Sequence, residues 1–187
     1  MLLLKFYLFA GLIIHKAVWE ILKKTDENQP KEPRSFSLLA VKGVKIAILI
    51  GVIVQTFLPD VLPISGEPFW IRAAGTVIYS LGLITAIAAR IQLGDNWANI
   101  ETGQVLDNQK VVARGVYKYI RHPIYTGDLL LLFGLELALN SWLFLGTFLL
   151  APIVMLKAIK EEQMLAEELS GYDAYRERTK RFIPFVI

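Results

Sequence analysis

Residues Lys110–Asp128 read K-V-V-A-R-G-V-Y-K-Y-I-R-H-P-I-Y-T-G-D, a basic and aromatic stretch between long apolar segments. It holds His122, one of 2 histidines in the chain, directly before Pro123. Proline disfavours helix at the residue before it and is well tolerated in the first turn of a helix. We therefore predict that the chain turns at His122 and that a helix begins at Pro123, where the first N–H groups stay free for a ligand.

Composition points to a membrane protein. The 187 residues are 55% hydrophobic with a mean hydropathy of +0.48, whereas an average soluble domain is roughly 45–50% apolar. The absence of cysteine excludes a disulfide framework, a cysteine zinc site and a thiol nucleophile, and so few histidines argue against any metal site. The net charge of +3 lies beside apolar segments, which indicates membrane-flanking loops and no nucleic-acid partner.

Five apolar segments approach the length of about 20 residues that a membrane-spanning helix needs. We predict an all-α, polytopic membrane protein that forms one domain over residues 1–187, with three spans within 1–93. The last two spans form a helical hairpin, and amphipathic helices after Lys160 lie at the cytoplasmic membrane surface. The fourth span is short unless it begins near Tyr125. The expected spans are Leu2–Leu22, Leu38–Leu58, Phe69–Leu93, Leu129–Leu139 and Trp142–Ile159.

Lysine and arginine set the expected orientation, because basic loops stay in the cytoplasm. They gather in residues 23–37, in residues 94–121 and after Lys160, whereas the Pro59–Pro68 link has none. The N-terminus is therefore predicted to lie outside, and the C-terminus inside.

The hairpin would bring Tyr125 beside Glu161 and Glu162 at one cytoplasmic mouth. There Arg121 and His122 could meet a carboxylate while tyrosines stack on a ring or a sulfonium. The same residues could instead form only an interfacial anchoring belt. The two glutamates could take an ammonium or ribose hydroxyls, or they could simply be solvated at a helix end.

Polar groups inside the spans need their own explanation. A carboxylate at membrane depth is costly, so Glu136 either has a polar partner or lies near the outer interface. His15 on the first span is interpreted as a packed or interfacial histidine rather than a ligand.

Two motifs flank the predicted hairpin and together resemble a known family. G-V-Y-K-Y-I-R-H-P-I-Y-T-G occupies residues 115–127, and K-E-E-Q-M-L-A-E-E-L-S-G-Y-D-A-Y-R-E-R-T-K-R-F-I-P occupies residues 160–184. In order and spacing, residues 93–184 resemble the isoprenylcysteine carboxyl methyltransferase family, which is grouped with the phospholipid methyltransferases. The resemblance implies an enzyme that uses S-adenosylmethionine, with a cofactor-binding methyltransferase core over residues 94–187.

The resemblance also implies roles for individual residues. The cofactor site would lie at the cytoplasmic face, closed by the C-terminal helices. Asn96 and Trp97, in L-G-D-N-W, match the approach to the substrate pocket. The expected catalytic residues are Lys157, Glu161 and Arg121. The residues expected to bind the cofactor are Gln109, Lys110, Val111, Val112, Tyr117, His122, Pro123, Ile124, Tyr125, Glu161 and Glu162.

Two departures from the family pattern bear on the acceptor. Lys157 stands where those enzymes have an arginine, and Gln109 where they often have a histidine; a lysine loses the bidentate grip on a carboxylate. We predict a lipophilic acceptor that enters from the bilayer, either a prenylcysteine-type carboxylate or a lipid amine. A carboxylate needs no base, whereas an amine or hydroxyl does, and Glu161, Asp128 or His122 could serve.

Two other functions fit parts of the sequence. Sterol and steroid reductases, which use NADPH, share R-H-P-x-Y-x-G and a terminal Y-x-x-Y…T…I-P pattern. The K-E-E-x-x-L-x-x-E run at residues 160–168 fits the methyltransferases better. A helical membrane protein without enzymatic activity would leave the Tyr-Arg-His-Pro turn and the glutamates opposite it unexplained.

Overall fold

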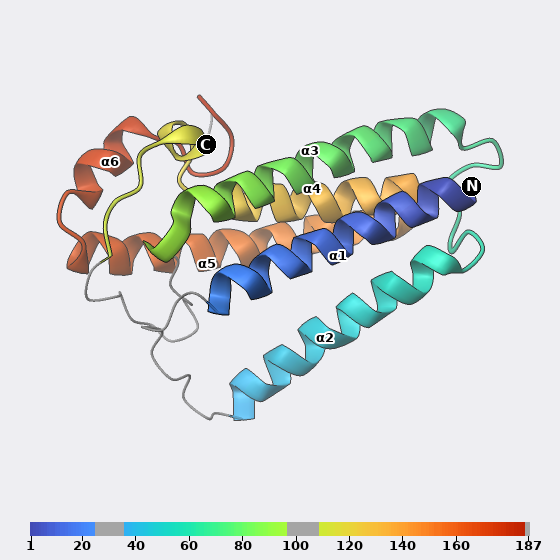
Figure 1. Cartoon of the computed structure of the whole chain (residues 1–187), viewed down its shortest axis with the longest axis horizontal. Helices are drawn as coiled ribbons and strands as arrows, with labels where there is room; N and C mark the ends of the chain where they lie inside the picture. The colour runs from blue at the N-terminus through green and yellow to red at the C-terminus, as the bar shows by residue number, and fades with distance from the viewer. Residues whose placement is uncertain (25–35, 97–108, 186–187) are drawn as a thin grey trace.

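A computed structural model of the chain describes residues 1–24, 36–96 and 109–185, apart from the side chains of 23–24, 36–42 and 44–45. The regular elements in these ranges are all helices, which run side by side along most of the molecule (Figure 1). They are α1 (Leu2–Lys24), α2 (Phe36–Phe57), α3 (Phe69–Leu93), η1 (Gly94–Asn96), η3 (Gly115–Lys118), α4 (Pro123–Ala138), η4 (Trp142–Leu145), α5 (Gly146–Glu168) and α6 (Tyr172–Arg178).

The predicted all-α class is confirmed, with one boundary that differs. Helix α4 begins at Pro123, as its chemistry predicts, and α3 has the expected bounds. Helix α5 continues without interruption to Glu168, so the fifth apolar segment and the amphipathic residues after Lys160 form one helix. The polar residues of this stretch are good helix formers, so leaving the apolar region does not end the helix.

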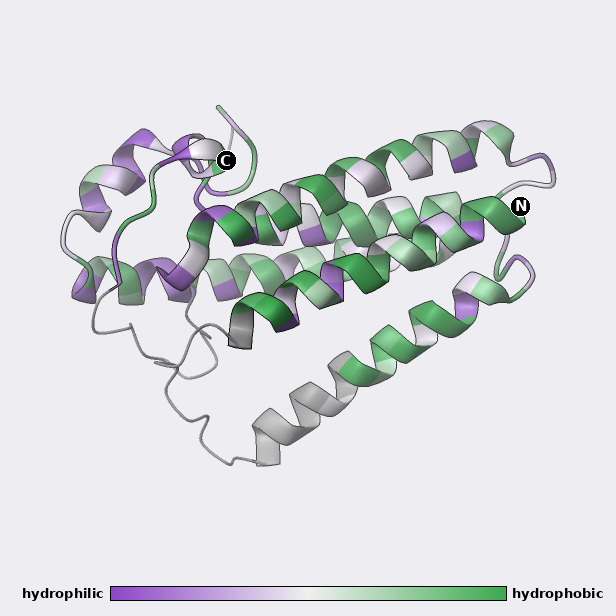
Figure 2. Ribbon diagram, viewed as in Figure 1, coloured by the Kyte–Doolittle hydropathy of each residue, from purple (hydrophilic) through white to green (hydrophobic). Residues whose placement is uncertain are grey.

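Among the residues that the structure describes, three helices are long and apolar enough to cross a bilayer: Leu2–Leu22, Phe69–Asn96 and Trp142–Glu168. Figure 2 shows apolar residues along most of their length. Ile46–Phe57 forms a shorter apolar stretch of α2, and α4 has 16 residues. The chain is therefore an integral membrane protein, and five spans remain a prediction.

Helices α3 and α4 pack backbone against backbone. A methyl group added at Gly82 of α3 would overlap the backbone nitrogen of Leu131, and one added at Gly134 of α4 would overlap that of Tyr79. Small residues permit such close contact between helices in lipid, where van der Waals packing supplies the attraction. This contact, which we call the glycine seam (Gly75, Gly82, Gly127, Gly134), fixes the position of α4 on α3.

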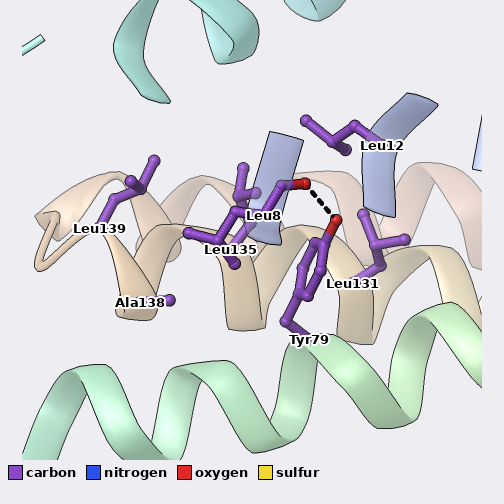
Figure 3. Packing of buried hydrophobic residues seen from close by; sticks show 7 residues of the cluster. All are labelled: Leu8, Leu12, Tyr79, Leu131, Leu135, Ala138 and Leu139. Atoms are coloured by element: carbon purple, nitrogen blue, oxygen red, sulfur yellow. Dashed lines mark hydrogen bonds between the residues drawn. The ribbon is translucent and has the colours of Figure 1, made fainter. Parts of the chain in front are cut away.

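An apolar cluster joins α1 to the seam (Figure 3). Tyr79 lies at its centre and donates a hydrogen bond to the Leu8 carbonyl oxygen at 2.6 Å. The buried Glu136 accepts a hydrogen bond from Gln55 of α2 at 2.7 Å, so it has the polar partner that one of its two interpretations requires. The cluster consists of Leu8, Leu12, Tyr79, Leu131, Leu135, Ala138 and Leu139.

Asp60 lies in the link between α2 and α3, at the end of the molecule opposite α6. It accepts hydrogen bonds from Arg72 at 2.6 and 2.8 Å and from Asn140 at 2.9 Å. Burial acts to raise the pKa of Asp60, but these hydrogen bonds and the Arg72 charge outweigh it and hold the pKa below its usual value.

Candidate functional site

A hollow lies where the C-terminal ends of α3 and α5 meet the start of α4 and α6. Its empty volume is about 810 Å³, counting the part that opens to solvent. Backbone and side chains of the segment before η3 form one wall, and the last turns of α5 form another. The lining residues are Leu93, Asn96, Gln109, Lys110, Val111, Val112, Tyr117, Arg121, His122, Ile124, Tyr125, Glu161, Met164, Leu165, Leu169, Tyr172 and Tyr175.

The turn before α4 builds the floor of the hollow. His122 has φ −120° and ψ 54°, outside the helical range, and Pro123 opens the helix. The His122 ring then stacks on Tyr125, with ring centroids 5.4 Å apart and an angle of 11° between the planes. The proline turn therefore aims a stacked pair of flat rings at the hollow.

Glu162 is a structural anchor rather than a lining residue. Its carboxylate is buried and accepts hydrogen bonds from Arg121 Nε at 2.9 Å and from Arg181 at 2.7 and 2.9 Å. His122 Nε2 lies 3.1 Å from the same carboxylate. Two cations and an imidazole thus surround one carboxylate, which holds the turn, α5 and the C-terminal segment together.

Glu161, the neighbouring residue, is bound quite differently. Its side chain lines the hollow, and no hydrogen bond reaches its buried Oε2 from the part of the chain that the structure describes. His122 Nδ1 lies 3.5 Å from that oxygen, close enough for electrostatic attraction if the ring is protonated. A buried acceptor without a donor is costly, so the carboxylate is suited to a ligand that supplies N–H or O–H groups.

The C-terminal segment is bound to the turn that forms the floor of the hollow. Arg121 N donates to the Lys180 carbonyl oxygen at 2.8 Å, and His122 N donates to that of Arg181 at 3.0 Å. Thr126 donates through Oγ1 to the Phe182 carbonyl oxygen at 3.1 Å. We call residues 179–182 the strap, because they bind along the turn before α4.

Three tyrosines line the same region from η3 and α6. Tyr175 donates to the Tyr117 carbonyl oxygen at 2.8 Å, which fastens α6 over η3. Burial is the largest cause that raises the pKa of Tyr117, Tyr172 and Tyr175 well above the usual range. All three hydroxyls are therefore neutral hydrogen-bonding groups at physiological pH.

Most of the predicted site residues meet at this hollow. Of those named from the sequence, Asn96, Arg121, Glu161, Gln109, Lys110, Val111, Val112, Tyr117, His122, Ile124 and Tyr125 line it. Pro123 and Glu162 lie behind its wall, and Trp97 falls outside the described residues. Lys157 is not a lining residue; its Nζ lies over the Tyr125 ring, 5.9 Å from the centroid.

For part of the lining, the structure differs from the expectation drawn from the sequence. Met164, Leu165 and Leu169, the apolar side of the segment after Lys160, were expected at the membrane surface, yet they line the hollow. Their helical spacing identified an apolar face but not the surface that it covers. Tyr172 and Tyr175 were missed for the same reason.

Comparisons with known proteins identify a family and several similar relatives. The model of the phospholipid methyltransferase family matches residues 70–170, more than half of the chain. A protein-S-isoprenylcysteine O-methyltransferase B of Arabidopsis thaliana is 27% identical over 157 residues, covering 80% of this chain and 78% of the relative. A protein-S-isoprenylcysteine O-methyltransferase of Xenopus laevis is 26% identical over 134 residues, but this chain spans only 45% of that relative's length.

A solved structure has a similar fold. It is that of a eukaryotic intramembrane Ras methyltransferase, an isoprenylcysteine carboxyl methyltransferase. The TM-score is 0.58 at 19% identity, and the match covers 98% of this chain and 68% of the other.

Proposed function

Because this chain belongs to the phospholipid methyltransferase family, we propose that it transfers a methyl group from S-adenosylmethionine to a lipophilic acceptor at the membrane interface. The predicted membership of a membrane methyltransferase group is confirmed by the family match. The observation that carries the proposal is the buried Glu161 Oε2, to which no described residue donates a hydrogen bond, in a hollow walled by aromatic rings.

The residues of the hollow fit the cofactor. Glu161 would accept from its ammonium or from its ribose hydroxyls, and the stacked His122 and Tyr125 rings would receive the adenine or the sulfonium. The backbone of Gln109 to Val112 would line the opposite side. When bound, the cofactor supplies an electrophilic methyl group, and the chain supplies position, which accounts for much of the rate in such a transfer.

Arg121 and Lys157 have different roles in this proposal. Arg121 uses Nε for Glu162 and Nη1 for the backbone of Arg176 and Thr179, so it holds the mouth together. Lys157 keeps a positive charge beside Tyr125, where it would attract an anionic acceptor without a bidentate grip. Asn96 accepts from Lys110 N at 2.7 Å and so keeps the segment before η3 against the hollow.

The proposal includes a membrane arrangement. Five spans place the N-terminus outside and the hollow at the cytoplasmic face, since basic residues flank this end and the Pro59–Pro68 link has none. The whole chain acts as one domain. A water-soluble cofactor would enter from the cytoplasm, and a lipid-soluble acceptor would reach it from the bilayer.

Calorimetric titration of the purified protein in lipid nanodiscs tests this function. We expect S-adenosylmethionine and its demethylated product to bind and NADPH not to bind; binding of NADPH alone would replace the proposal with a reductase. Glu161→Gln should weaken binding of S-adenosylmethionine by about 10-fold or more, the cost of roughly one charged hydrogen bond. Glu167→Gln, at an exposed position of the same helix, is the matched control and should bind like the unaltered protein.

A further inference from the structure

We infer that His15 and Asp128 form a proton-accepting pair that serves a methyl acceptor whose nucleophilic atom carries a proton, an amine or a hydroxyl. His15 Nε2 and Asp128 Oδ1 lie 2.9 Å apart, although the residues belong to α1 and α4. The inference rests on the proposed methyl transfer and names the class of acceptor.

Two other groups in the described part of the chain that could act as a base, Glu161 and His122, are already engaged. Glu161 faces the hollow that would hold the cofactor, and His122 is held by Glu162 and stacked on Tyr125. The His15–Asp128 pair lies outside this cluster, so it stays available for an acceptor.

The pair lies near the hollow along α4, although neither residue lines it. Asp128 is within one turn of the α4 helix from Ile124 and Tyr125, which line the wall. His15 continues the face of α1 that packs through Leu8 and Leu12 against α4. The apolar contact of α1 with α4 therefore ends in a polar pair at the end of the bundle where the cofactor would bind.

The exposure of the pair argues against a purely structural role. The side chains of His15 and Asp128 are 23% and 44% exposed, so part of the contact is open to a ligand. An exposed ion pair adds only about 0–1 kcal/mol to stability, so joining α1 to α4 is not by itself a sufficient role for the pair.

The geometry also leaves the correct atom free. The His15 ring stacks on Trp19 of the same helix, with centroids 4.2 Å apart and an interplanar angle of 24°. Asp128 holds Nε2–H, so the neutral ring carries its lone pair on Nδ1. No described residue makes a hydrogen bond to Nδ1, and the imidazole can therefore take a proton there while Asp128 stabilises the resulting cation.

The step balances as an ordinary methyl transfer. The acceptor nitrogen or oxygen forms a bond to the methyl carbon, and the electron pair of the breaking carbon–sulfur bond stays on sulfur. The proton of the acceptor passes to His15 Nδ1 and leaves later to water. A carboxylate acceptor has no proton to lose and would gain nothing from the pair.

Nuclear magnetic resonance of the protein in nanodiscs, without cofactor, tests the contact directly. With ¹⁵N-labelled histidine, 2 rings give signals, and His122→Gln identifies those of His15. We expect hexadecylamine and hexadecanol to shift the His15 Nδ1 signal, and hexadecyltrimethylammonium, which has no N–H, to leave it unchanged. Equal shifts with all three, or no shift with any, would overturn the assignment.

Methylation rates provide the second measurement. His15→Gln and Asp128→Asn should lower methyl transfer to hexadecylamine or hexadecanol by about 10²-fold or more. In both variants, transfer to an S-farnesylcysteine carboxylate and the affinity for S-adenosylmethionine should stay unchanged. The Lys16→Gln control should keep every rate of the unaltered protein.

The results with the different acceptors distinguish failure of the His15–Asp128 pair from failure of the proposed function. An equal loss with the carboxylate acceptor would reduce the pair to a structural contact, and cofactor binding with methylation of the carboxylate alone would overturn the pair but keep the proposed function. No binding of S-adenosylmethionine by the unaltered protein would remove both. Whether amine or alcohol is methylated faster identifies which protic acceptor the pair serves.

Discussion

Replacing Glu162 by glutamine removes the carboxylate that pairs with both Arg121 and Arg181 at the mouth of the hollow. The side chains of Glu162 and Arg121 are 3% and 9% exposed, whereas that of Arg181 is 27% exposed. Removing one partner of a buried ion pair costs about 3–5 kcal/mol, because the other charge stays buried and unpaired. Water can reach Arg181, so we expect the lower end, about 3 kcal/mol.

This cost should appear as opening of the strap rather than as global unfolding. At about 1.4 kcal/mol per tenfold, the equilibrium for detachment of residues 179–182 should rise on the order of 100-fold. Hydrogen–deuterium exchange of the amides that join strap and turn, those of Arg121, His122 and Lys180, reports this opening. The amides of α3 along the glycine seam should keep their protection.

Glu167→Gln is the matched control for this experiment too, since it removes a carboxylate from an exposed position of α5. Unchanged exchange at these three amides in Glu162→Gln would refute the reasoning, because it would mean that the Glu162 carboxylate does not hold the strap on the turn. Faster exchange that extends over α3 would also contradict it, by showing that the strap and the helical core open together.

Three further predictions concern the helical core and the opposite end of the molecule. Gly134→Leu should destabilise the protein by about 1–3 kcal/mol or more, because it overpacks the glycine seam. Gly146→Ala should be neutral, because an added methyl group there meets open space. Thermal unfolding in detergent measures both. Tyr79→Phe should cost about 0.5–1.5 kcal/mol for the lost hydrogen bond to α1, and an unchanged melting temperature would contradict this. The lowered pKa of Asp60 means that its contribution is complete above its ordinary pKa of about 3.9 and is lost as the pH falls through the folded value. The melting temperature of the unaltered protein should therefore fall more between pH 5 and pH 3 than that of Asp60→Asn.

Local chemistry in the sequence was sufficient for much of the architecture. The start of α4 followed from the restriction that Pro123 places on the preceding residue, and α3 followed from the length of its apolar run. The proximity of Tyr125 to Glu161 followed from the short link between the last two apolar segments. Each of these depends on residues that are neighbours in sequence or on a simple limit on chain length.

The remainder depends on rotations and long-range contacts that one sequence does not encode locally. Glu161 and Glu162 are adjacent, yet a step of one residue along a helix turns the side chain by about 100°. One carboxylate therefore faces the hollow and the other faces two arginines. His15 and Asp128 meet across 113 positions, which requires the arrangement of α1 against α4 to be known.

The strap makes the last residues of the chain part of the fold rather than a tail. Glu162 binds Arg181, 19 positions further along, so a chain cut before residue 179 would keep this buried carboxylate with only part of its counter-charge. The turn before α4 would likewise lose the Lys180 and Arg181 carbonyl oxygens as acceptors. A C-terminal truncation should therefore loosen the floor of the hollow while the helical frame along the glycine seam stays intact.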